Sequence, residues 1–504
     1  MTRLAGPFLL VLLIALTPLF VAVIPPIHDY PFHLARMEIL ASLPHSPFLR
    51  AHYEVGSYFL PNVGMDVAMM PLYHLFPIVT AGRVFLGLTL ALILSGTVAL
   101  HAAIHRRVSV WPLLAAFLLY NWIFLFGFLN YILGIGLALW AAAAWIAMMR
   151  RPALWRIVVG SVLSVAVLFC HLSAFGVLAL IVGGFELQRA GALFRSDRLA
   201  AVRGLALAAV PMFVALAVFV AVSPASGEAH QMMGYRSGLG WKPMIAYRTL
   251  FTTIGWLDIL TLTPIAVGAA WLMWRKRVRV APGMIVPFGL LVLAFLVLPF
   301  YIFGSEYGDA RIPIAIAFVG IASTTMDRVP RAMLLAVVAL LTVRSVVIAR
   351  DWMESDSRIA AITDAFHRLP KGATLFTATA GPYPSLNYID EAGLALWHPP
   401  LKHIASLAGL EPDVFVPSIW SDPSKQPMYV APAFQVVKQL QGDNPFKTQA
   451  TADLSAVFRK IAALPVSPSP TYMLLLFPDR LQGGLPAEAT MIAHNGDFAL
   501  MKLP

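Results

Sequence analysis

PFLLVLLIALTPLFVAVIPPIHDYPFHLAR, residues 7–36, joins an apolar run to a cluster of ionisable side chains. Residues 7–25 are long and apolar enough to cross a lipid bilayer as a helix. Asp29, flanked by His28 and His33, follows where that helix should leave the hydrocarbon core. Ionisable groups at membrane depth are energetically costly, so this cluster is a candidate for function.

The whole chain has the composition of a polytopic membrane protein. Of its 504 residues, 59% are hydrophobic and only 12% are charged, and the mean hydropathy is +0.77. Soluble domains carry about 25% charged residues. The net charge of +11 comes from short basic clusters between apolar runs, which is typical of cytoplasmic loops and not of a nucleic-acid-binding face. We therefore expect no nucleic-acid partner.

The apolar runs predict about eleven membrane-spanning helices. They lie at residues 7–25, 79–103, 110–127, 131–148, 157–170, 172–187, 204–222, 251–274, 283–303, 312–326 and 332–349. Residues 157–187 could also form one long helix through His171, but a single crossing there would invert the side of every later basic cluster. We therefore predict two short helices that meet at His171, a break that is tolerated where it lines a cavity.

The charge distribution predicts a cytoplasmic N-terminus. The opposite side then receives residues 26–78, 224–250, 304–311 and the tail after Arg350. From that point acidic and amide side chains reach the density of a soluble domain. We expect a transmembrane domain at 1–349, with a first outer loop at 26–78, and a soluble outer α/β domain at 350–504.

Within the tail, helical and strand patterns alternate. A helix is expected at 357–369, and strands are expected at 373–379, 472–477 and in both arms of 490–503. The last two arms should form a hairpin that turns at Asn495-Gly496. The Pro-rich segment 399–432 is expected to run over the surface.

The first outer loop should contain an amphipathic helix that lies in the membrane interface. Asp29 before Pro31 suits the start of a helix, and the apolar face that follows leaves His33 and Arg36 to one side. If Asp29 is a general base, partial burial would raise the pKa of its carboxyl group toward neutrality, where a base is most effective. With His28 and His33 it could instead bind a divalent metal. In the structural interpretation it only caps the helix.

Two further sets of polar residues are expected on the outer side. Arg311 stands where a helix re-enters the bilayer, and its forked donors could hold a lipid phosphate or pair with Asp309 or Glu306. Arg36 is a second phosphate candidate. Asn130 and His171 lie at turns between crossings and could line a pocket, although a buried histidine is also an ordinary core residue.

Motifs of several other enzyme classes do not occur in the sequence. It contains no Gly-rich phosphate loop ending in Lys-Ser/Thr, no Gly-x-Ser-x-Gly, no His-Glu-x-x-His and no paired-cysteine metal motif. No cytoplasmic segment is long enough for a nucleotide-binding domain.

The architecture resembles the C-type (GT-C) membrane glycosyltransferase superfamily. The matching features are Asp29 in His28-Asp29-Tyr30-Pro31-Phe32-His33, the loop to residue 78 and the tail from 350. Many members carry two adjacent acids where this chain has His28-Asp29. The resemblance implies a multi-pass protein of a bacterial inner membrane with a periplasmic tail.

The resemblance also implies an inverting transferase. It would move a sugar from a polyprenyl-phosphate or polyprenyl-diphosphate carrier to a glycan, lipid or protein acceptor. Asp29 would act on the acceptor hydroxyl, and Arg311 and Arg36 would neutralise the departing phosphate. His28 and His33 would assist Asp29 or complete a metal site with it. The alternatives are a lipid or polysaccharide flippase, and a non-catalytic subunit with this fold.

Overall fold

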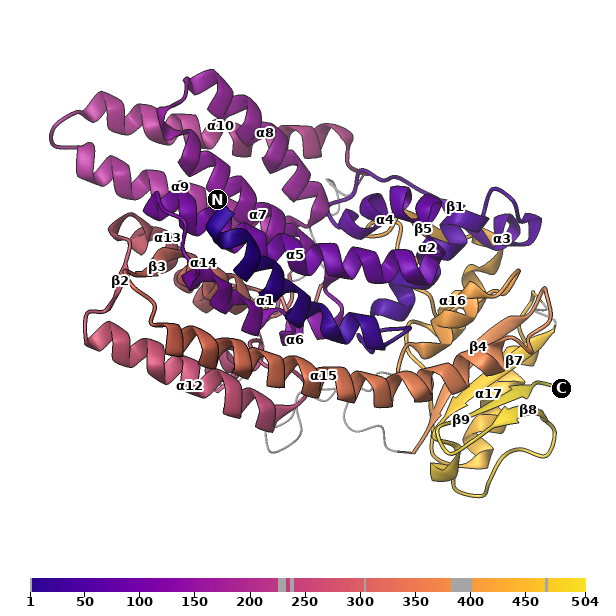
Figure 1. Ribbon diagram of the computed structural model, residues 1–504. Helices are drawn as coiled ribbons and strands as arrows, with labels where there is room; N and C mark the ends of the chain where they lie inside the picture. Colours follow the sequence, from indigo (N-terminus) through magenta and orange to yellow (C-terminus); the bar gives the residue numbers. More distant parts are fainter. Residues whose placement is uncertain (1, 225–232, 236–239, 303–304, 382–400, 467–469) are drawn as a thin grey trace. The chain divides into compact units, whose positions relative to one another are not determined.

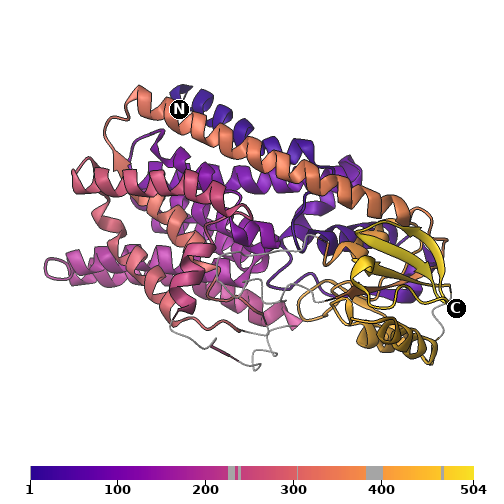
Figure 2. The same cartoon turned by 90° about the horizontal axis from the view of Figure 1, so that it is seen from below.

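The computed structural model describes residues 2–224, 233–235, 240–302, 305–381, 401–466 and 470–504 (Figures 1 and 2). They form two compact units, which are described separately below. Unit 1 comprises Met1–Phe20, Phe59–Val67 and Phe85–Arg350, and unit 2 comprises Val21–Tyr58, Ala68–Val84 and Asp351–Pro504.

Apolar helices dominate the chain up to residue 366. Eight described helices are long and apolar enough to cross a bilayer: α1 (Thr2–Val21), α5 (Ile78–His105), α7 (Leu129–Ala147), α8 (Ala153–Cys170), α9 (Leu172–Leu193), α10 (Arg198–Val222), α12 (Gly255–Trp274) and α15 (Arg331–Phe366). Three shorter apolar segments are η1 (Trp111–Leu118) with α6 (Trp122–Phe126), η4 (Pro282–Met284) with α13 (Ile285–Val297), and α14 (Ile312–Ser323). Each predicted run coincides with one of these segments, which confirms a helical membrane fold.

The predicted break at His171 is confirmed. His171 has an extended backbone, with φ −166° and ψ 125°, and separates α8 from α9. Arg156 near the start of α8 forms an ion pair of 2.8 Å with Glu186 near the end of α9, so the two helices are antiparallel (Figure 1). Trp145 of α7 and Arg189 also donate hydrogen bonds to the Glu186 carboxylate. The chain therefore reverses direction where the charge bias requires it.

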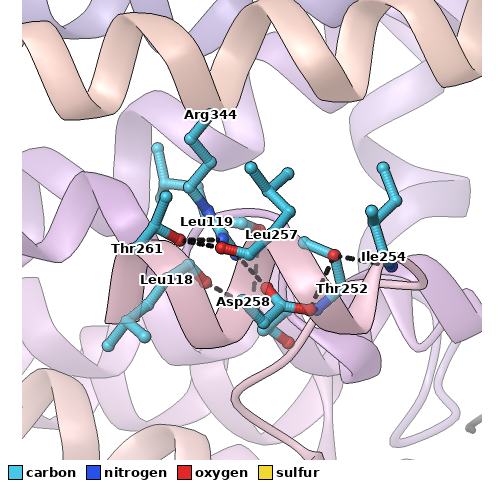
Figure 3. Close-up of polar contacts among 9 residues, drawn as sticks. Leu118, Leu119, Thr252, Ile254, Leu257, Asp258, Thr261 and Arg344 are labelled. Carbon is cyan, nitrogen blue, oxygen red and sulfur yellow. Dashed lines mark hydrogen bonds and ion pairs between the residues drawn. The ribbon is translucent and has the colours of Figure 1, made fainter. Parts of the chain in front are cut away.

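A buried ion pair connects α12 with α15 (Figure 3). Arg344 donates to Asp258 and to the Thr261 hydroxyl, each at 2.7 Å. The other oxygen of Asp258 accepts two hydrogen bonds of 2.8 Å from the backbone N–H and hydroxyl of Thr252. An unpaired charge among apolar helices is costly, so mutual neutralisation allows both residues to be buried there.

Unit 2 contains a five-stranded mixed sheet in the order β6-β4-β7-β9-β8. Its strands are β4 (Thr374–Ala380), β6 (Phe446–Thr448), β7 (Thr471–Leu476), β8 (Thr490–His494) and β9 (Phe498–Lys502), the last two drawn in yellow in Figure 2. β4 is parallel to β6 and β7, and the other pairs are antiparallel. The sequence-predicted strands and the hairpin turn at Asn495-Gly496 are confirmed, since Asn495 N–H donates to Phe498 O at 2.8 Å.

The remaining described helices and strands are short. They are α2 (Tyr30–Ser42), α3 (Pro47–His52), β1 (Tyr53–Val55), α4 (Gly64–Leu75), η2 (Met148–Arg150), α11 (Trp241–Arg248), β2 (Val278–Val280), β3 (Thr324–Met326), η5 (Ile404–Leu410), β5 (Met428–Val430), η6 (Pro432–Phe434), α16 (Gln435–Gln441), α17 (Thr451–Ala462) and η7 (Pro478–Arg480).

Parts of the first outer loop belong to the same compact unit as the tail. α2 packs on η5, and β1 pairs antiparallel with β5. Two expectations are therefore wrong. Residues 401–409 are buried and do not run over the surface, and α2 is buried from Tyr30 to Met37 instead of exposing a polar face. The close packing has a local cause: a Cβ on Gly409 would lie 3.3 Å from Ala35 Cβ.

Candidate functional site: a buried acid with two histidines, and a separate buried arginine

Asp29 occupies the N-cap position of α2 and is buried, with 1% of its surface exposed. Its side chain makes no capping hydrogen bond. Among the described residues, neither carboxylate oxygen receives a hydrogen bond. Buried polar groups are nearly always hydrogen-bonded, and the exceptions call for an explanation. The Asp29 side chain therefore does not cap the helix, and a bound ligand would supply the hydrogen bonds that its carboxylate lacks.

Two imidazoles face this carboxylate within unit 2. Nε2 of His28 lies 3.7 Å from Asp29 Oδ1, and Nε2 of His403 lies 3.6 Å from the same oxygen. The two rings contact each other edge to face, with centroids 4.6 Å apart. His403 comes from the tail, immediately before η5, and was not predicted from the sequence. No local motif marks it; the adjacent Lys402-His403 pair before an apolar segment is the available signal.

Burial controls protonation at this cluster. It raises the pKa of the Asp29 carboxyl well above its usual value, while the positive charge of Lys402 acts in the opposite direction. Burial also lowers the pKa of His403 well below its usual value, and Lys402 adds to this effect. The His403 ring is therefore neutral at pH 7. A carboxyl group with a raised pKa holds a proton more firmly, which suits a general base.

The same three residues also have the geometry of a metal site. One ligand atom each from His28, Asp29 and His403 lies within 4.8 Å of the others. Ligands at about 2.0–2.1 Å from a tetrahedral zinc are separated from one another by about 3.4 Å. The distances of 3.7 and 3.6 Å from Asp29 Oδ1 to Nε2 of His28 and of His403 are close to that value. Neutral imidazole and carboxylate are ordinary zinc donors. The structure therefore places His403 in the position that the sequence analysis gave to His33.

His33 and Arg36 lie further along α2 and are both buried. The Arg36 guanidinium is 3.1 Å from His33 Nδ1, which therefore accepts a hydrogen bond from it. Phe32 stacks on Trp420 with centroids 4.7 Å apart, and its ring also contacts His403 at 4.3 Å. An aromatic wall, formed by Phe32 and Trp420, thus stands beside His403. Flat aromatic faces of this kind offer apolar contact to a ligand.

In unit 1, Arg311 precedes α14 and is 5% exposed. Its guanidinium lies over the ring of Phe128, 4.6 Å from the centroid. It donates no hydrogen bond and forms no ion pair to any residue in the described ranges. Burial lowers the pKa of Arg311 to about 10, against the raising effects of Tyr131 and Asp309, so it is charged at pH 7. A buried cation without a paired anion can accept one from a ligand.

Both acids that were considered as partners of Arg311 are engaged elsewhere. Asp309 Oδ2 lies 2.8 Å from Lys242 Nζ and accepts a hydrogen bond of 2.9 Å from Trp241. Glu306 accepts a hydrogen bond of 2.8 Å from the Tyr301 hydroxyl. These contacts argue against a structural ion pair between Arg311 and either acid.

His171 and Asn130 lie on the same part of unit 1. The Tyr131 ring contacts His171 edge to face with centroids 5.3 Å apart, and its hydroxyl donates to the Arg311 carbonyl at 2.5 Å. Asn130 instead accepts from Met65 N–H at 2.6 Å and so connects α7 to the first outer loop. Tyr131 is thus the link between His171 and Arg311, whereas Asn130 has a structural contact of its own.

Comparisons with known proteins bear on the fold. No protein-family model matches the chain, and no curated protein matches its sequence. Two crystal structures of ArnT from Cupriavidus metallidurans do match, one in the apo state with a TM-score of 0.50 and one bound to undecaprenyl phosphate with a TM-score of 0.52. Each is 12% identical, and the comparison covers 99% of this chain and 98% of ArnT. The chain therefore shares the fold of ArnT over nearly its whole length.

Proposed function

We propose that this protein is a membrane glycosyltransferase that uses a polyprenyl-phosphate-linked sugar. The observation that carries the proposal is the buried Asp29 carboxylate, which lacks a hydrogen-bond donor in the described part of the chain. Two observations support it: the buried Arg311 guanidinium, which forms no ion pair among the described residues, and the fold shared with ArnT, which has been crystallised with undecaprenyl phosphate. The acceptor would be a glycan, a lipid or a protein.

In the proposed reaction, the acceptor oxygen forms a bond to the anomeric carbon of the donor sugar. Its proton passes to Asp29, and the bond between the sugar and the phosphate oxygen breaks with its electrons on the phosphate. Attack opposite to the leaving group inverts the sugar configuration. Negative charge grows on the phosphate in the transition state, so a preorganised cation lowers the barrier selectively.

Roles for the other residues follow from their surroundings. Arg311 would hold the lipid phosphate, because its guanidinium is charged and buried without an ion-pair partner among the described residues. His28 and His403 would orient Asp29 through its Oδ1. His33 would position the Arg36 guanidinium through the hydrogen bond that it accepts, and Arg36 would be a second candidate for binding phosphate. The basic clusters support a cytoplasmic N-terminus and a periplasmic tail in a bacterial inner membrane.

A divalent cation at His28, Asp29 and His403 is the alternative chemistry that we propose for the same cluster. It would keep Asp29 ionised and supply positive charge for an acceptor or phosphate oxygen. The discriminating measurement is zinc titration of purified protein by calorimetry, with H403A and H33A as a matched pair. We expect H403A to lose binding and H33A to retain it. No binding in the wild type would leave Asp29 as a base without metal.

The decisive test of the function is D29N in purified protein reconstituted with a polyprenyl-phosphate sugar. Loss of a general base should lower the transfer rate by about 10²–10⁴-fold. D422N, which changes an exposed acid of the same unit, is the control and should retain activity. Full activity of a correctly folded D29N would reject the catalytic role. No transfer by the wild type, with lipid movement across vesicles instead, would favour a flippase; neither activity would favour a non-catalytic subunit.

A further inference from the structure

We infer that Lys242 is a positioning residue that keeps Arg311 available for the lipid phosphate by neutralising Asp309. The inference rests on the proposed function. It concerns α11 and the segment before α14, both in unit 1, and it gives a role to three side chains that the sequence did not single out as a group.

The ammonium group of Lys242 is fully engaged. It donates to the carbonyl oxygens of Phe295 and Leu298 at 2.8 and 2.6 Å, and it lies 2.8 Å from Asp309 Oδ2. A lysine has three N–H donors, and these contacts use all of them. Lys242 is therefore not itself a phosphate ligand. Two of its acceptors belong to the C-terminal turn of α13, where carbonyl groups lack partners within the helix.

Asp309 is the acid most able to interfere with Arg311. It is two residues away and 1% exposed on its side chain, and its charge raises the pKa of Arg311. Its Oδ2 is held by Lys242 and Trp241, whereas its Oδ1 receives no hydrogen bond from the residues that the structure describes. The carboxylate is thus already compensated on the side of α11, and the Arg311 guanidinium stacks on Phe128 instead.

Removing Lys242 would leave a buried carboxylate without its cation. Such a charge is strongly unfavourable, and pairing with another nearby cation relieves the cost. Arg311 is the cation at hand. Once paired with Asp309, its guanidinium would offer fewer donors and less net charge to a phosphate. Lys242 therefore acts on the phosphate through Asp309 and not by contact.

The test measures the affinity for undecaprenyl phosphate of the full chain in nanodiscs, together with its thermal unfolding midpoint. K242M should weaken the affinity about tenfold, which corresponds to about 1.4 kcal/mol of binding free energy. K242M/D309N should return it to within about twofold of wild type, and K242R should retain it. D309N alone should bind as tightly as wild type or more tightly, because it adds net positive charge beside Arg311.

A merely structural ion pair predicts a different pattern. D309N and K242M would then both weaken binding, in step with their unfolding midpoints, and that result would overturn the inference. D327N, which breaks an exposed ion pair with Arg107, is the matched control and should leave the affinity unchanged. R311A distinguishes failure of the role of Lys242 from failure of the phosphate-binding role of Arg311. If R311A abolishes binding and K242M does not alter it, only the role of Lys242 fails; if R311A binds normally, the phosphate assignment fails and this inference fails with it.

Discussion

Replacement of Arg344 by methionine should lower the free energy of unfolding by about 3–4 kcal/mol, near the lower end of what breaking a buried ion pair costs. The side chains of Arg344 and Asp258 are only 2% and 0% exposed, so solvent cannot compensate either charge. R344M removes two hydrogen bonds donated by the charged guanidinium, each worth about 1.5–3 kcal/mol. It also leaves one oxygen of Asp258 bare, while Thr252 still holds the other.

Chemical or thermal unfolding in detergent measures this loss, and a double-mutant cycle isolates the pair. R344M/D258N removes both charges and should be less destabilised than R344M alone, because no buried charge remains without a partner. R331M changes an exposed arginine of the same helix and should alter stability by less than about 0.5 kcal/mol. The reasoning is refuted if R344M costs no more than R331M, or if adding D258N to R344M destabilises the protein further.

Three further predictions concern the Asp29 cluster. Activity should fall as the pH drops through the raised pKa of Asp29, so the acid limb of the kcat/KM profile should lie well above the pKa of an ordinary aspartate. K402M removes a charge that lowers the Asp29 pKa and should move this limb to still higher pH; a downward shift would contradict the assignment. G82A should impair transfer, since its Cβ would clash with the Tyr30 hydroxyl beside Asp29, whereas G87A in the same helix meets nothing closer than 3.8 Å and should be active. W420A should raise KM for the sugar donor more than it lowers kcat if the aromatic wall contacts the substrate; equal effects on both would place Trp420 in a purely structural role.

The membrane architecture was predictable because hydropathy and charge bias act over short stretches. The reversal at His171 followed from the basic clusters, and the hairpin followed from Asn495-Gly496. His28 was predicted beside Asp29, but the approach of His403 was not predictable, because it depends on the packing of α2 on η5. For the same reason, residues 401–409 of a Pro-rich segment expected on the surface are buried.

Other missed residues had a local signal. Arg344 and Asp258 are charges within apolar runs, and such residues are candidates for pairing from sequence alone. Which acid pairs with which base depends on helix packing, and one sequence does not determine that. The same holds for Asp309, where the sequence suggested Arg311 as a partner and the structure shows Lys242.

The arrangement around Asp29 has a consequence for biogenesis. Its partner His403 is made 403 − 29 = 374 residues later, which at bacterial rates of about 5–20 residues per second is a delay of roughly 20–75 s. During that interval the first helices can insert, but the carboxylate lacks His403, and α2 lacks the η5 segment on which it packs. A nascent or truncated chain would therefore occupy the membrane without a complete site. Completion of the tail sets the moment at which the Asp29 cluster can first assemble.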